Sequence, residues 1–173
     1  SKSNTRGAVA LCALALTVAP LSAAHADAAK DVQVAGRALT FLENGPTGKA
    51  VLGVVFDPSK PASVAEKNAV MAAIGGGMSA GAVTLTAKPV EASAVSGVSG
   101  VAALYVTTGV NVGAAAKAKK LITIGSDTSC ATSGACVMSV SADPKVEIVV
   151  NRAAAAAVGA VFKAAFRMMI REV

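Results

Sequence analysis

Continuous apolar runs alternate along this chain with segments of helical character, and this alternation constrains the fold more than any other feature. Most of the runs have no polar face, so each is predicted to be a strand that is buried on both sides. Strands of this kind, separated by helices, form a parallel sheet with helices on both of its faces. The sequence therefore predicts an α/β protein, a three-layer α/β/α sandwich with a mostly parallel sheet. The expected strands are Ala50–Phe56, Val83–Thr86, Val101–Val106 and Leu121–Ile124, and the expected helices are residues 30–43, Val64–Ile74, Val90–Val98 and Ala114–Lys120.

The last third of the chain is predicted to add an antiparallel hairpin and a long C-terminal helix. Two short apolar runs meet at Asp143-Pro144, which is a typical turn dipeptide. Beyond Asn151, apolar residues recur at helical spacing and form one stripe. This stripe is expected either to pack on the sheet or to bind a partner. Its members include Val158, Phe162, Phe166 and Met169.

The first 26 residues have the pattern of an export signal. Lys2 and Arg6 precede an apolar run over residues 8–20, and Ala24-His25-Ala26 supplies a small-x-small cleavage site. The run is short and ends in proline, so an uncleaved membrane anchor is the weaker interpretation. We expect cleavage after residue 26, a location in the periplasm, and a single domain over residues 27–173.

The composition argues against catalysis. The only histidine is His25, which belongs to the predicted leader, and the chain has no tryptophan and one tyrosine. Histidine is the usual general acid or base near neutral pH and a common metal ligand. The net charge of +6 is spread along the chain, and aromatic residues that stack on bases are scarce. We expect no enzyme, no catalytic residues, no metal or cofactor, and no nucleic-acid partner.

Cys130 and Cys136 are the two cysteines outside the leader. In an oxidising compartment they are expected to form a disulfide bond. A redox-active pair is the minority interpretation, because the spacing is not Cys-x-x-Cys.

Polar and glycine-containing segments follow several of the predicted strands. Ser63 and Glu66 match a capping box at the start of a helix, and Asn151 is expected to cap the last helix. Ligands of open α/β folds bind at the carboxyl ends of the strands. A ligand pocket is therefore expected near Asp57, residues 107–109 and Ser126-Asp127.

The order of these C-terminal features resembles the YfiR family of periplasmic proteins. A strand ending in Ser126-Asp127 is followed by a disulfide-bonded loop containing Gly134, and a strand with Glu147-Ile148 leads to Asn151 before an alanine-rich helix. This chain lacks the aromatic residues usual after the first helix of the family. It also has two extra residues between Ile148 and Asn151.

The resemblance implies a regulator that binds the periplasmic part of an inner-membrane diguanylate cyclase and holds it inactive, so that cyclic-di-GMP synthesis and biofilm formation respond to the envelope. A homodimer is compatible with such a regulator. Two alternative functions remain open. One is a small periplasmic protein that senses a small-molecule ligand without a cyclase partner, and the other is a structural protein of the envelope.

Overall fold

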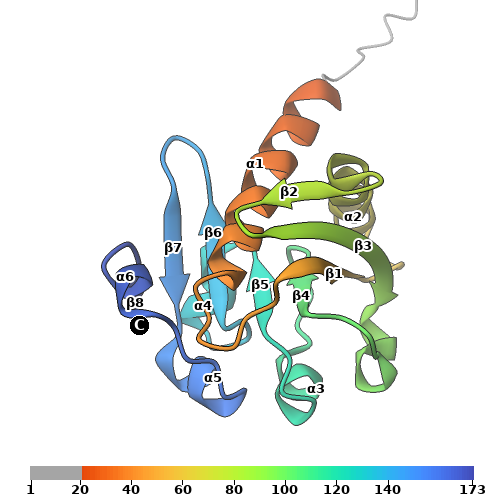
Figure 1. Cartoon of the computed structure of the whole chain (residues 1–173). Helices are drawn as coiled ribbons and strands as arrows, with labels where there is room; N and C mark the ends of the chain where they lie inside the picture. The colour runs from red at the N-terminus through yellow and green to blue at the C-terminus, as the bar shows by residue number, and fades with distance from the viewer. Residues whose placement is uncertain (1–20) are drawn as a thin grey trace, which may run out of the picture.

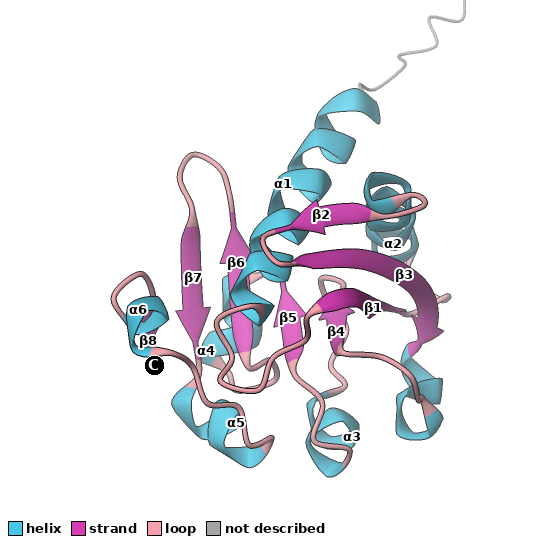
Figure 2. Ribbon diagram, viewed as in Figure 1, coloured by secondary structure: helices cyan, strands magenta, loops and turns pink. Residues whose placement is uncertain are grey.

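The computed structural model describes residues 21–173, which fold as helices on both faces of one sheet (Figures 1 and 2). The first half contains α1 (Leu21–Leu39), β1 (Gly48–Phe56), α2 (Pro61–Ile74), β2 (Met78–Ala80), β3 (Val83–Glu91), the 3-10 helix η1 (Ala92–Gly97) and β4 (Ala103–Val106). The second half contains α3 (Gly113–Ala118), β5 (Thr123–Gly125), α4 (Thr128–Thr132), β6 (Met138–Ser141), β7 (Glu147–Val150), α5 (Arg152–Ala157), α6 (Ala164–Arg167) and β8 (Arg171–Glu172). Most of the leader predicted at residues 1–26 lies outside the described residues.

The described strands form one sheet in the order β2-β3-β1-β4-β5-β6-β7-β8. The five strands from β3 to β6 are parallel, while β2 pairs antiparallel with β3 and β7 pairs antiparallel with β6. The predicted α/β fold, with a mostly parallel sheet and a C-terminal hairpin, is confirmed. The short edge strand β2 was not predicted, and β3 continues five residues beyond the predicted strand.

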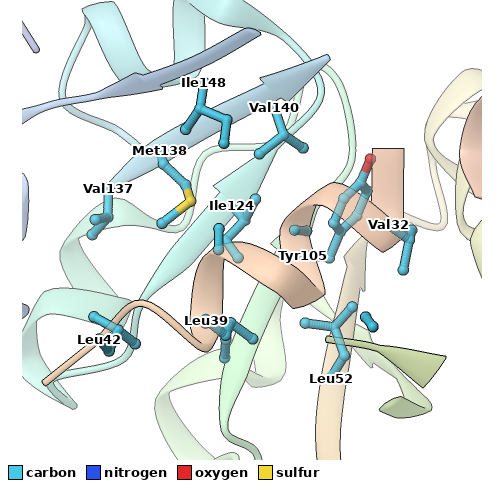
Figure 3. Close-up of a cluster of buried hydrophobic side chains, with 14 of the residues drawn as sticks. Val32, Leu39, Leu42, Leu52, Tyr105, Ile124, Val137, Met138, Val140 and Ile148 are labelled. Atoms are coloured by element: carbon cyan, nitrogen blue, oxygen red, sulfur yellow. The ribbon is translucent and has the colours of Figure 1, made fainter. Parts of the chain in front are cut away.

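Side chains on the central strands alternate between two apolar cores. On one face, Leu52, Val54 and Tyr105 pack with residues of α1 and α2. Figure 3 shows part of this core, with Val32 and Leu39 of α1 beside the strand residues. On the other face, Val55, Leu104 and Val106 pack with residues of η1 and α3, and with Cys136. A sheet buried on both faces is what the continuous apolar runs require.

The prediction of one long C-terminal helix is wrong. Helix α5 ends at Ala157, because Gly159 adopts a left-handed conformation (φ +71°). The amide N–H of Gly159 donates to Ala156 O, and that of Ala160 donates to Ala155 O. These two bonds form a Schellman motif, which satisfies the last carbonyl groups of a helix and terminates it. The chain then reverses, and its last residues run beside β7 as α6 and β8 (Figure 1).

The predicted apolar stripe is divided by this reversal. Val158, Phe162 and Phe166 are buried in the core that contains α1. Phe166 contacts the rings of Phe41 and Phe162, with centroids 5.1 and 4.9 Å away. Met169 is 57% exposed and is not part of this core. Three of the four residues therefore belong to the core. They reach it through the turn at Gly159, which the helical spacing did not predict.

Candidate functional site

The carboxyl ends of β1, β4 and β5 lie side by side and form the candidate site. Strand β1 has β3 on one side and β4 on the other. After β1 the chain first forms β3 on one side of β1, and it then crosses to form β4 on the other side. In open α/β sheets, ligands bind at such a reversal of strand order, outside the carboxyl ends of the strands.

Ser63 and Glu66, the two residues predicted to cap α2, connect this helix to the strand ends by hydrogen bonds. The capping-box prediction is wrong, because the helix begins at Pro61 with Lys60 as its N-cap and no side-chain cap. The Ser63 hydroxyl instead accepts from the Asp57 amide N–H (2.9 Å) and bonds to the Thr107 hydroxyl (2.7 Å). Proline at the first helical position has no N–H group that a cap would have to satisfy. The Ser63 and Glu66 side chains are therefore available for tertiary contacts.

Glu66 joins α2 to the ends of two neighbouring strands. Its Oε2 accepts from the Thr108 amide N–H at 2.8 Å, and its Oε1 accepts from the Ser126 hydroxyl at 2.7 Å. Hydrogen bonds to an ionised carboxylate are stronger than those between neutral groups. Glu66 therefore fixes the spacing of the loops that follow β4 and β5.

A hollow of about 200 Å³ lies between the loop after β4 and the disulfide-bonded loop. Among the residues predicted to form a pocket, Thr107, Thr108, Gly109 and Asp127 line it. Asp57 is not one of its lining residues and is held in its own turn by Ser59, whose side-chain and backbone hydrogen bonds lower the pKa of the Asp57 carboxyl group. Ser126 does not line the hollow either, so the prediction located the hollow but included two residues that lie outside it.

Cys130 and Cys136 form the predicted disulfide bond, with their Cα atoms 4.9 Å apart. Cys136 is fully buried, and its amide N–H donates to Cys130 O at 2.7 Å. Cys130 and Ser133 belong to the residues that line the hollow. The bond therefore holds one side of the candidate site in place.

Asn151 connects this loop to the C-terminal segment. Its Oδ1 accepts from the Ala154 amide N–H, which confirms the predicted cap of α5, and its Nδ2 donates to Ala131 O in α4, both at 2.9 Å. Gly134 has φ +80°, and a Cβ placed on it would lie 3.5 Å from Asn151 Nδ2. Asn151 and Gly134 are thus neighbours across the two segments.

The other positions that resemble the YfiR motif divide into two groups. Asp127 caps α4 by accepting from the Ser129 amide N–H, and its carbonyl accepts from the Ser139 hydroxyl. Ser126 bonds to Glu66. Glu147, in contrast, is exposed at the start of β7. The fold brings Ser126, Asp127, Gly134 and Asn151 together around the disulfide loop and leaves Glu147 apart.

A second cavity, of about 260 Å³, lies between α1, α2 and β4, and the sequence analysis did not identify it. Its polar lining residues are Asp27, Asp31, Glu66 and Tyr105. Asp27 and Asp31 stand four residues apart on α1 and so share one helix face. That spacing was the available sequence signal.

Two properties of the described residues bear on the class of protein. No group of three or more His, Cys, Asp and Glu side chains within residues 27–173 is arranged to hold a metal ion. Of the helices described here, none has the length and apolar character needed to span a membrane.

Comparisons with known proteins show similarity at the level of fold. No family model and no curated protein matches the sequence. A conserved domain protein from Vibrio cholerae O1 biovar El Tor has a similar solved structure, with a TM-score of 0.57 and 14% identity over 84% of this chain and 59% of that one. The ligand-free, open structure of a substrate binding protein with adhesive properties from Clostridium difficile matches with a TM-score of 0.51 and 16% identity, over 72% of this chain and 54% of that one.

The chain thus spans little more than half the length of each of these two proteins. At such identities the similarity shows the fold alone. The disulfide bond, together with a fold shared with a substrate binding protein, is compatible with a location outside the cytoplasm.

Proposed function

We propose that the chain is a YfiR-like regulator of the periplasm, which binds the periplasmic part of an inner-membrane diguanylate cyclase and holds that enzyme inactive. The observation that supports this most is the contact between Asn151 and the disulfide loop. Asn151 donates to Ala131 O and lies beside Gly134. Asn151 and Gly134, two of the residues that carry the resemblance, therefore belong to one structural unit with the disulfide loop.

The exposed apolar residues of the C-terminal edge suit a protein partner. We use this name for Val146, Val161, Met168, Met169 and Val173, which are 40 to 89% exposed. Grooves of about 260 and 330 Å³ lie on either side of the C-terminal segment. Exposed apolar patches of this kind are typical of protein interaction sites, and methionine adapts its shape to a partner.

Charged residues border this edge. Lys145 and Arg171 line one groove, while Arg152 and Arg167 line the other and both pair with Glu172. A polar rim around an apolar centre is the usual composition of a protein interface. We therefore propose this edge as the surface that contacts the cyclase.

Affinity capture from solubilised membranes tests the proposal. The wild-type protein is expected to retain a diguanylate cyclase, and a Met168→Glu/Met169→Glu variant is expected to lose it, because charges are costly at an apolar contact. Ala94→Glu is the matched control, since Ala94 is exposed on η1, at the opposite face of the sheet. Failure of the wild-type protein to retain a cyclase, with both cysteines oxidised, would contradict the proposal.

A ligand sensor without a cyclase partner is the second candidate. The hollow favours it, because it lies at the carboxyl ends of β4 and β5, the edge of the parallel sheet at which folds of this class bind ligands. A gene for a transporter or receptor next to the gene for this protein would support this candidate. A neighbouring gene for a membrane cyclase would support the first.

A further inference from the structure

The chain has five methionines, and the structure divides them by their exposure to solvent. Met138 is fully buried, and Met71 and Met78 are partly buried against the core that contains α1. Met168 and Met169 lie on the short segment that connects α6 to β8 (Figure 1), and they are 89% and 57% exposed. Two adjacent thioether groups are therefore accessible at the C-terminal edge, while the other three are shielded wholly or in part.

The other side chains that oxidants commonly attack are absent from residues 27–173 or are protected there. The chain has no tryptophan, and its only histidine is His25 of the predicted leader. Tyr105 is the only tyrosine and is 1% exposed. Cys130 and Cys136 are joined in a disulfide bond, so they present no thiolate to an oxidant. Within residues 27–173, the two exposed methionines are therefore the side chains that an oxidant reaches first.

Oxidation of methionine changes the character of an apolar surface. The sulfur atom takes one oxygen atom from hydrogen peroxide, so the thioether is oxidised to a sulfoxide and the peroxide is reduced to water. The sulfoxide is polar, whereas the thioether is apolar and adapts its shape to a partner. An apolar partner that covers the sulfoxide oxygen removes its hydrogen bonds to water, which is unfavourable. Oxidation therefore weakens a contact that buries these side chains.

We propose that Met168 and Met169 form an oxidation-sensitive modification site, at which conversion to methionine sulfoxide by peroxide prevents the C-terminal edge from binding its partner. The other members of this edge are valines, which peroxide leaves unchanged. The reaction takes place on the free protein, in which both methionines are exposed. Reduction of the sulfoxide, in which two thiol groups supply the electrons and the oxygen atom leaves as water, restores the apolar surface. The inference rests on the proposed function, because the partner is the cyclase proposed to contact this edge.

The selectivity of the modification is tested without a partner. The purified protein, with its disulfide bond intact, is treated with hydrogen peroxide, the excess is removed with catalase, and the sulfoxide at each methionine is quantified by peptide mass spectrometry. We expect Met168 and Met169 to be oxidised about tenfold or more faster than Met138, with Met71 and Met78 between them, because reactivity follows exposure. Oxidation of Met71 or Met78 ahead of the exposed pair would overturn the proposal.

Capture from solubilised membranes then tests the effect on binding. Wild-type protein that carries sulfoxides at Met168 and Met169 is expected to retain about tenfold less cyclase than untreated protein, because unpaired polar oxygens are costly at an apolar contact. Circular dichroism verifies that the treated protein is folded. Undiminished retention by the oxidised protein would overturn this inference alone. No retention by the untreated protein would overturn the proposed function together with it.

Two double variants assign the effect to the exposed pair. Leucine has nearly the volume of methionine and contains no sulfur. Met168→Leu/Met169→Leu is compared with its own untreated sample, and peroxide is expected to leave its retention of cyclase unchanged. Met71→Leu/Met78→Leu is the matched control, because it removes two sulfur atoms outside the C-terminal edge. The control is expected to lose the cyclase on treatment, as wild type does.

The control also decides the outcome if Met168→Leu/Met169→Leu retains no cyclase before treatment. Loss of the cyclase by the treated control, with Met138 still a thioether in the mass spectra, then assigns the effect to Met168 and Met169. Equal losses on treatment in both double variants would refute the assignment. So would undiminished retention by the treated control.

Discussion

Replacing Asn151 by alanine is expected to lower the free energy of unfolding by about 2 kcal/mol. Loss of the bond from the Ala154 amide N–H removes the cap of α5, which costs about 1 kcal/mol. Loss of the bond to Ala131 O costs about 1 kcal/mol more. The second cost stays low because the Ala131 carbonyl keeps the Gly134 amide N–H as a partner, so no buried carbonyl is left unsatisfied.

Asn151→Ser separates the two contributions, because serine retains a capping oxygen but has no amide donor. Urea unfolding followed by circular dichroism is expected to show a loss of about 1 kcal/mol for the serine variant, half that of the alanine variant. An alanine variant within about 0.5 kcal/mol of wild type, which is the usual effect of an ordinary surface substitution, would refute the role given to Asn151. Equal losses in both variants would show that the cap contributes nothing.

Three further predictions concern stability. Replacing Cys130 and Cys136 by serine should lower the unfolding free energy by about 2 kcal/mol, the chain-entropy value for so short a loop, and chemical denaturation of both forms checks it. Phe166→Ala should cost about 3 to 5 kcal/mol in the same assay, because the ring is fully buried; a loss under about 1 kcal/mol would mean that the C-terminal segment is not packed as described. Asp31→Asn should raise stability at neutral pH. The raised pKa of Asp31 favours folding below its unfolded value of 3.8 and loses that contribution as pH rises through the folded value, so thermal unfolding should show the gain shrinking in acid.

Alternation of apolar runs was sufficient to predict the architecture. A buried parallel strand such as β1 needs apolar side chains on both faces, and this requirement is visible in the sequence alone. The same holds for the hairpin at Asp143-Pro144, because its turn residues are local. The disulfide was equally accessible, since Cys130 and Cys136 are the only cysteines among the residues described.

The C-terminal reversal could not be read from periodicity. Val158, Phe162 and Phe166 fit helical spacing and are all buried, yet they reach the core from two separate segments. The deciding residue is Gly159, which adopts the left-handed conformation without steric cost, and the chain that returns after it pairs Phe162 with Leu42. One glycine within an apolar pattern does not reveal this, because helices tolerate single glycines at a modest cost.

The candidate site was predicted in part. The rule that ligands bind at strand ends located Thr107 and Asp127, because it depends only on the order of strands. It did not predict that the Ser63 and Glu66 side chains hydrogen-bond to those strand ends and do not cap the helix. The cavity lined by Asp31 and Tyr105 was missed because its two sides come from α1 and β4, which are distant in sequence.

The concentration of cyclic-di-GMP in cells that lack this protein tests the central claim most directly. If the protein holds a diguanylate cyclase inactive, removing it should raise cyclic-di-GMP, and expression of the wild-type protein should restore the original concentration. The Met168→Glu/Met169→Glu variant should fail to restore it, while Ala94→Glu should succeed. An unchanged or lower concentration of cyclic-di-GMP in cells without the protein would contradict the account.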